Sequence, residues 1–312
     1  MNLFDLHCDT LYKAVTNNLP LDDKSMQVSQ ILGEDNKRLQ CYAIWIPDDY
    51  TSEKAEQTFF SAYQRLTSEC KRLSIKLIEQ NESISDAFKN NKNSALFTIE
   101  NSTALNGKIG NVEKFAKLGV RIITLTWNAS NAVGDGADVS DSTGITDFGK
   151  SVVREMEKYG VVVDVSHASD KLFYDVAEIA TRPFAATHSN SRFVTNHRRN
   201  LTDEQFKIIK ERNGIVGINF HRDFLSDNPD SASIYDLLKH INKFLSLGGE
   251  NVICIGTDFD GCNLPYDITG SESLAEIYEM LLRHNYKESL IRKIFYENAL
   301  NFFENFDNRR IM

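Results

Sequence analysis

Seven residues close to the start of the chain, FDLHCDT at positions 4–10, contain three side chains that can bind a metal ion or move a proton. These are Asp5, His7 and Asp9, each separated from the next by one residue. Side chains two residues apart on an extended strand point to the same face, so His7 and Asp9 can reach one ion. The stretch is therefore either an acidic loop or the first half of a metal site.

Other histidines and carboxylates stand at or just after the ends of short apolar runs. They are Glu100, His167, His188 and Asp258, with Asp260 two residues further on. Imidazole and carboxylate together suit Zn²⁺ and similar ions. Three histidines with at least two carboxylates are enough to hold two divalent ions.

The apolar runs are rich in β-branched and aromatic residues, which predicts strands. Eight of them occur, at residues 2–7, 39–46, 94–100, 120–127, 161–167, 184–189, 214–220 and 252–258. Stretches with helical periodicity lie between most of these runs and also close the chain. They cover residues 52–73, 111–119, 147–160, 168–180, 202–214, 233–249 and 286–306.

Strands that alternate with helices form parallel sheets with both faces covered. Eight such units predict an α/β fold, a (β/α)8 TIM barrel with a C-terminal helical extension, and a single domain over residues 1–312. A doubly wound sheet is the alternative, but it usually has a glycine-rich loop after the first strand, where this chain has HCDTLY. In a barrel the strand ends share one rim, which would bring the candidate ligands together.

Several other side chains that could bind metal or move protons are expected to have other positions or roles. Strand parity points Cys8 away from His7 and into the barrel wall, and it leaves Asp5 either behind the ligands or paired within its strand. His240 and His284 lie in helical stretches and are expected to face solvent. His221 follows the seventh run and could contact a substrate.

The composition excludes several classes of function. A net charge of -9 argues against nucleic-acid binding, which needs a basic surface. The sequence has neither an apolar run long enough for a membrane helix nor a signal-peptide pattern at its start, so no membrane association is expected. The five cysteines are odd in number and lack CxxC spacing. A reduced, cytoplasmic location is the expectation.

Seven motifs in order carry a resemblance to a known family: FDLHCDT, TIEN, LGVRIITLTWN, VVVDVSH, ATHSNSR, HRRNLTD and IGTDFDG. Together they resemble the membrane (renal) dipeptidase family, peptidase family M19, of the amidohydrolase-type metal-dependent barrel superfamily. The similarity runs from residue 3 to the YENALNFF segment, which is nearly the whole chain.

The resemblance implies a dipeptidase with two divalent ions, expected to be zinc, and a hydroxide that bridges them as the nucleophile. Glu100 would bridge both ions. His7 and Asp9 would complete one ion, and His167 and His188 the other. The implied partner is a dipeptide, with a D-residue tolerated at its C-terminal position, and the family suggests a homodimer.

The resemblance also assigns roles around the metals. Asp258 matches the catalytic aspartate, and Arg199 matches the arginine that holds the C-terminal carboxylate of the substrate. The better-known dipeptidases have a histidine where this chain has Trp127. Trp127 and Asn128 are therefore expected to contact the substrate near the oxyanion, with a weaker electrostatic effect than an imidazolium.

Without the family resemblance, the residues are also compatible with two other functions. The LTWN motif is compatible with an amidohydrolase that acts on N-acyl amino acids, cyclic amides or lactones. A barrel that binds a ligand without catalysis is the third possibility.

Overall fold

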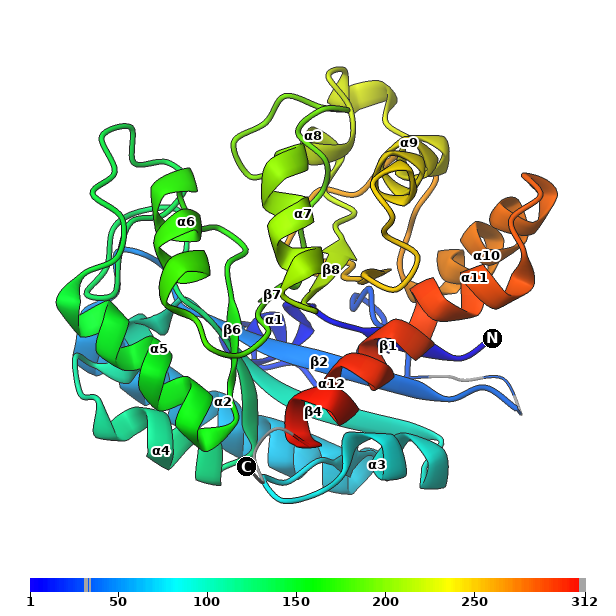
Figure 1. Ribbon diagram of the computed structural model, residues 1–312. Coiled ribbons are helices and arrows are strands. Elements are labelled where there is room, and N and C mark those ends of the chain that lie inside the picture. The colour runs from blue at the N-terminus through cyan, green and yellow to red at the C-terminus, as the bar shows by residue number, and fades with distance from the viewer. Residues whose placement is uncertain (31–32, 34, 309–312) are drawn as a thin grey trace.

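Parallel strands form one closed barrel in the computed structural model, which describes residues 1–30, 33 and 35–308 (Figure 1). The strands are β1 (Leu3–Asp5), β2 (Arg38–Trp45), β3 (Lys76–Leu77), β4 (Asn93–Glu100), β5 (Val120–Thr124), β6 (Val162–Asp164), β7 (Ala185–Ala186), β8 (Ile215–Ile218) and β9 (Ile253–Ile255). Eight of them form the ring in the order β2-β1-β9-β8-β7-β6-β5-β4, and β2 pairs with β4 to close it. Among the described strands, the short β3 pairs only with β4, outside the ring. The predicted α/β barrel is confirmed.

Helices surround the barrel and follow the predicted alternation. They are α1 (Thr10–Thr16), α2 (Ser52–Leu73), α3 (Ile84–Asn90), η1 (Ser102–Leu105), α4 (Gly110–Lys117), α5 (Asp147–Tyr159), α6 (Asp170–Ile179), α7 (Asp203–Glu211), α8 (Arg222–Leu225), η2 (Pro229–Ser231), α9 (Ile234–Ser246), η3 (Ser271–Ser273), α10 (Leu274–Arg283), α11 (Glu288–Arg292), η4 (Lys293–Glu297) and α12 (Asn298–Asn308). Hydroxyl side chains begin several of them. Thr202 accepts a hydrogen bond from the backbone of Gln205, whose side chain bonds back to Thr202 in a capping box.

Several short elements were not predicted. The helices α1, α3, α8 and α10 and the two-residue strand β3 are additions to the expected pattern. The C-terminal stretch 286–306 is helical as predicted, but it is divided by the π-helical turn η4. The helices α1, α3 and α8 span one or two turns and β3 spans two residues, which is too little for a periodic signal to stand out. The helix α10 is as long as the predicted α6 and was missed.

The C-terminal helix α12 closes one end of the barrel. The ring of Phe303 stacks on Phe4 of β1 at 5.6 Å between centroids, and both side chains are fully buried. Arg121 of β5 is also buried and forms an ion pair with Asp307. Figure 1 shows α12 (red) lying across the barrel, and α12 also contacts β8 and β9. With this end sealed, the other end of the barrel is left for a site.

The strands end earlier than predicted. The expected strand ends at His7, His167, His188 and Asp258 lie two or three residues beyond the observed ends of β1, β6, β7 and β9. The backbone is left-handed at His167 (φ 68°) and Asp258 (φ 63°), a conformation that cannot continue a β ladder. The candidate residues therefore stand on the first turns after the strands, while Glu100 is the last residue of β4 as predicted.

The solvent-exposed position predicted for His240 is wrong. Its side chain is fully buried, and Nδ1 accepts a hydrogen bond from the backbone of Ser191 while Nε2 donates to the carbonyl of Leu225. The face of α9 that carries His240 packs under these loops instead of facing water. His284 is exposed as predicted. Across the described residues, no helix combines the length and the apolar character needed to cross a bilayer.

Candidate active site

A cavity of about 220 Å³ opens at the unsealed end of the barrel. Side chains at the ends of β2 and β4 and in the segments after β1, β5, β6, β8 and β9 line it, so almost the whole rim contributes. The lining residues are Asp9, Tyr12, Trp45, Glu100, Trp127, Asn128, His167, His221, Phe224, Asp258, Asp260 and Gly261. The rim predicted from the strand ends is therefore a real concave site.

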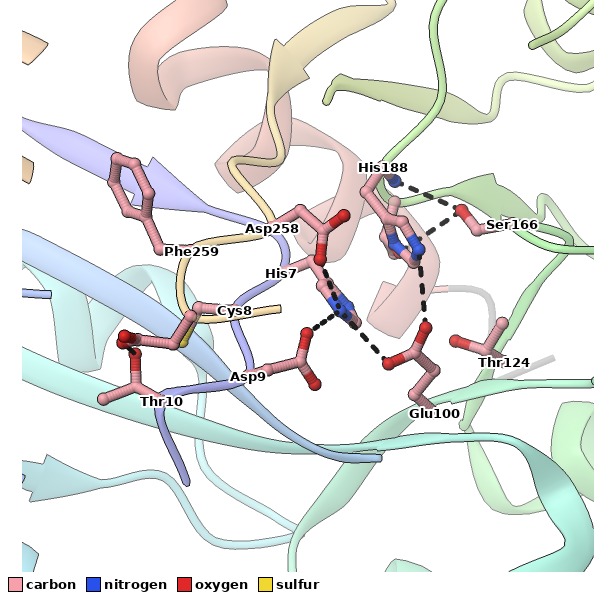
Figure 2. Close-up of polar contacts among 12 residues, drawn as sticks. His7, Cys8, Asp9, Thr10, Glu100, Thr124, Ser166, His188, Asp258 and Phe259 are labelled. Atoms are coloured by element: carbon pink, nitrogen blue, oxygen red, sulfur yellow. Dashed lines mark hydrogen bonds and ion pairs between the residues drawn. The ribbon is translucent and has the colours of Figure 1, made fainter. Parts of the chain in front are cut away.

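Glu100 is the central group of this rim. Its Oε2 atom lies 3.5 Å from Nε2 of His7, and its Oε1 atom lies 2.7 Å from Nε2 of His167 and 3.7 Å from Nε2 of His188. All four side chains are buried. Figure 2 shows Glu100, His7 and His188 pointing toward one another, Glu100 from the end of β4 and the histidines from the segments after β1 and β7. The two oxygens of one carboxylate thus face different histidines.

His7 connects this cluster to two more carboxylates. Its Nε2 atom lies 3.3 Å from Oδ2 of Asp9 and 3.9 Å from Oδ1 of Asp258. Among the described residues, two groups have ligand atoms close enough to hold an ion, namely His7 with Glu100 and His188, and His7 with Asp9 and Asp258. His7 belongs to both, which differs from the even division between two ions that the family resemblance implies.

The residues present fit divalent metal ions. Nε2 of His188 and Oδ1 of Asp9 are buried and have no hydrogen-bond partner among the described residues. Buried polar atoms of this kind normally find a partner, which makes each a candidate metal ligand. Imidazole nitrogen and carboxylate oxygen are donors that suit Zn²⁺ and related ions.

Burial and mutual charge set the protonation of the cluster. Burial lowers the pKa of His7, but Glu100 and Asp9 more than offset this and hold it well above its usual value. Burial, with the positive charges of His7 and Arg199 nearby, keeps the pKa of His188 well below its usual value. Burial also raises the pKa of Asp258 well above that of a free carboxylate. The site therefore favours a neutral imidazole at His188 and favours the protonated carboxyl form of Asp258 more than water does.

The residues after β5 lie against the cluster. Oδ1 of Asn128 lies 2.8 Å from Nδ1 of His167, which leaves Nε2 of that ring facing Glu100. Trp127 packs edge-on against Trp45, with 4.9 Å between the ring centroids, and both line the cavity. Asn128 thus orients a candidate ligand, a contact that the sequence did not reveal.

Arg199 is buried beside the cluster. Its guanidinium lies 5.4 Å from the ring of Phe224, and its Nε and Nη2 atoms have no hydrogen-bond partner within the described part of the chain. Burial lowers the pKa of Arg199 to about 10, although Asp258 and Glu100 act in the opposite direction. The side chain is still a cation near neutral pH and has donors to offer to an anion.

The two aspartates with undecided roles have structural partners. Asp5 accepts hydrogen bonds from Gln40 and from both the backbone and the hydroxyl of Thr257, and so joins β1 to β2 and to the segment after β9. Asp260 accepts from the hydroxyl of Thr10 and from Nζ of Lys13. Each carboxylate is used to hold segments of the rim together.

Gly261 is a site residue that the sequence reasoning missed. A Cβ atom at this position would lie 2.0 Å from Oδ2 of Asp9 and 2.7 Å from Oδ1 of Asp258, closer than any side chain tolerates. Only glycine lets the backbone pass this close to both carboxylates. The sequence feature that could have identified this glycine is its position directly after Asp260 in the motif GTDFDG. Tyr12, Trp45 and Phe224, the other missed lining residues, could not be told from core aromatics.

The described geometry agrees with a comparison of the sequence with known families. Residues 1–310 match the model of the family described as membrane dipeptidase, peptidase family M19. The chain belongs to this family. As a member it is a metal-dependent dipeptidase, a hydrolase, which confirms the function and the reaction class predicted from the motifs.

Related proteins support this assignment. A Klebsiella pneumoniae protein described as "Uncharacterized protein in pqqA 5'region" is 31% identical over 220 residues, which are 66% of this chain and 80% of that protein. The structure of dipeptidase AC, a metallo peptidase of family M19, has a TM-score of 0.89 at 25% identity and covers 97% of this chain and 98% of its own.

A second solved structure shows the same fold. The metallo peptidase from Rhodobacter sphaeroides, liganded with a phosphinate mimic of the dipeptide L-Ala-D-Ala, has a TM-score of 0.88 at 23% identity. The similarity covers 97% of this chain and 99% of that chain. At this level of identity the likeness establishes the shared fold.

The ionisation of Asp9 predicts a pH-dependent stability. Burial and the nearby Glu100 raise the pKa of Asp9 from 3.8 to about 6, against the opposing effect of His7. The charged form therefore destabilises the metal-free protein, and the penalty grows between pH 4 and 6 and is complete above pH 6. Replacing Asp9 with Asn should raise the unfolding free energy at pH 8 by roughly 3 kcal/mol. Urea unfolding of the metal-free proteins from pH 4 to 8 measures the difference, which should shrink toward pH 4. A variant that is destabilised equally at every pH would contradict the prediction.

Proposed function

We propose that this chain hydrolyses dipeptides with two divalent ions, expected to be zinc, held by His7, Asp9, Glu100, His167 and His188. The placement of Glu100 is the observation that carries the proposal. One of its oxygens faces His7, and the other faces His167 and His188. A carboxylate placed in this way suits a bridge between two ions. When bound, such ions lower the pKa of a water molecule and polarise the peptide carbonyl.

Asp258 is the residue that we propose moves the proton. Its Oδ1 atom lies 3.9 Å from Nε2 of His7, and its Oδ2 atom accepts a hydrogen bond of 3.0 Å from Asn219. Burial raises its pKa well above the usual value, so the carboxylate is a stronger base than a solvated one. Asp258 would accept a proton from water and pass it to the leaving amine.

Arg199 would recognise the free carboxylate of the substrate. Its buried Nε and Nη2 atoms, both without partners among the described residues, match the two oxygens of a carboxylate. A buried cation beside the residues that would hold the metals would favour dipeptides over longer chains. The Rhodobacter sphaeroides peptidase was liganded with a mimic of L-Ala-D-Ala, which supports tolerance of a D-residue at this position.

Trp127 and Asn128 would contact the substrate near the developing oxyanion. Trp127 lines the cavity and can supply an indole N–H donor. Asn128 already uses its Oδ1 atom on His167, so only its amide NH2 group remains to face a substrate. The cavity wall on this side is aromatic, because Trp127, Trp45 and Tyr12 pack edge to face.

The proposal also covers the cellular location and the oligomeric state of the protein. The cysteines at 8, 41, 70, 254 and 262 are all free thiols, which supports a place in the reducing cytoplasm. The homodimer stays a prediction from the family resemblance.

Metal removal tests the proposed function. We expect the protein to hydrolyse Ala-Ala, to lose this activity after dialysis against a chelator, and to regain it when Zn²⁺ is added, because the nucleophilic water depends on the ions. N-acetyl-alanine serves as the comparison substrate. Hydrolysis of Ala-Ala that is unchanged after removal of the metal would refute the proposal, and a clear preference for N-acetyl-alanine would favour an N-acyl amidohydrolase.

Substitution of Arg199 tests recognition of the carboxylate. We expect Arg199→Met to lower kcat/KM for Ala-Ala by about 100-fold, as removal of one partner of a buried charged pair does. The same variant should hydrolyse Ala-alanine amide as well as the wild type does. Arg198→Ala is the matched control, since Arg198 is largely exposed and pairs with Asp138. An equal loss of kcat/KM for Ala-Ala and for Ala-alanine amide would show that Arg199 does not bind the substrate carboxylate.

A further inference from the structure

Asp164, the last residue of β6, accepts four hydrogen bonds without touching the cavity. Oδ1 accepts from the backbone N–H groups of Ser166 (3.0 Å) and Thr187 (2.9 Å). Oδ2 accepts from the hydroxyls of Thr124 and Thr187, both at 2.6 Å. Asp164 is fully buried, and these bonds fill the acceptor capacity of a carboxylate. The group is therefore held rigidly at the barrel wall.

The hydroxyl of Thr187 connects this carboxylate to His188. Oγ1 lies 2.6 Å from Oδ2 of Asp164 and 2.9 Å from Nδ1 of His188. A hydroxyl has one hydrogen to donate, and the short bond to an acceptor-only carboxylate takes it. Toward His188 the oxygen can then only accept, so Nδ1 must carry the hydrogen. In the neutral ring this leaves the lone pair on Nε2, the buried atom that faces Glu100.

We propose that Asp164 and Thr187 are positioning residues, a relay that fixes the tautomer and the orientation of His188 for metal binding. The inference rests on the proposed function in that His188 is taken as a metal ligand. A hydrogen-bonded partner on the second ring nitrogen commonly orients a histidine ligand and raises its basicity. Here the carboxylate acts through a threonine hydroxyl instead of touching the ring.

The same arrangement occurs a second time on the rim. Asp5 ends β1, accepts from the backbone of His7 two residues later, and binds both the N–H and the hydroxyl of Thr257. Thr257 directly precedes Asp258, as Thr187 directly precedes His188. Each aspartate thus ties the turn after its own strand to a site residue after another strand, which argues that the carboxylates serve the geometry of the site.

Thr187→Val removes the relay and keeps the shape of the side chain. Thr124→Val is the matched control, because Thr124 gives the same 2.6 Å bond to the same oxygen of Asp164 but makes no described contact with His188. Thr187→Ser keeps the hydroxyl. The metal-loaded full chain is titrated with a chelator that competes for Zn²⁺, and unfolding by urea is followed in parallel.

We expect Thr187→Val to bind Zn²⁺ about 10–100-fold more weakly, as loss of an outer hydrogen bond to a ligand does. Thr187→Ser and Thr124→Val should stay close to the wild type in affinity, even where Thr124→Val loses as much stability as Thr187→Val. Equal Zn²⁺ affinity in the two valine variants would overturn the proposal.

The tautomer is measured independently of metal binding and hydrolysis. In the metal-free full chain with ¹⁵N-labelled histidine, long-range ¹⁵N–¹H correlations should place the hydrogen of His188 on Nδ1. A hydrogen on Nε2 in the wild-type chain would overturn the relay. A chain that binds no Zn²⁺ at all but has the Nδ1 tautomer would instead contradict the proposed function and leave the relay intact.

Discussion

The burial of Glu100 among three histidines is the constraint on which the rest of the structure depends. A carboxylate loses its hydration in such a place and must be compensated by partners at short range. His167 lies at 2.7 Å, and His7 and His188 lie on the two sides of the same group. Asp9 and Asp258 add two more buried carboxylates, whose raised pKa values show the cost of holding them there. A site of this composition is stabilised by cations.

Most of the reactive side chains lie just past the ends of the barrel strands. Glu100 stands on the end of β4, but the histidines and Asp258 stand on turns whose backbones are held by their neighbours. Asp258 donates its backbone N–H to the carbonyl of His7, and the carbonyl of His167 accepts from the backbone of Ala137. Left-handed backbone at His167 and Asp258 is tolerated because these contacts fix it. The turns that carry the site are therefore hydrogen-bonded to neighbouring segments, and α12 closes the other end of the barrel.

Much of this arrangement could be predicted from the sequence, because strand ends in a parallel barrel share one rim. The eight predicted strands form, and Glu100, His7 and His188 meet although they lie far apart in the chain. The ends of the strands could not be predicted, since they depend on local backbone turns. Contacts that depend on how loops fold back, such as Asn128 on His167 or the burial of His240, leave no periodic signal either.

The metal content of the wild type and of Glu100→Ala tests the central claim most directly. In the proposed site one carboxylate serves both ions, and the remaining ligands alone are too few to keep either one. Mass spectrometry of the intact, Zn²⁺-equilibrated proteins under non-denaturing conditions should find two ions per chain in the wild type and none in Glu100→Ala. Two ions retained by a folded Glu100→Ala variant would show that Glu100 is not the bridge.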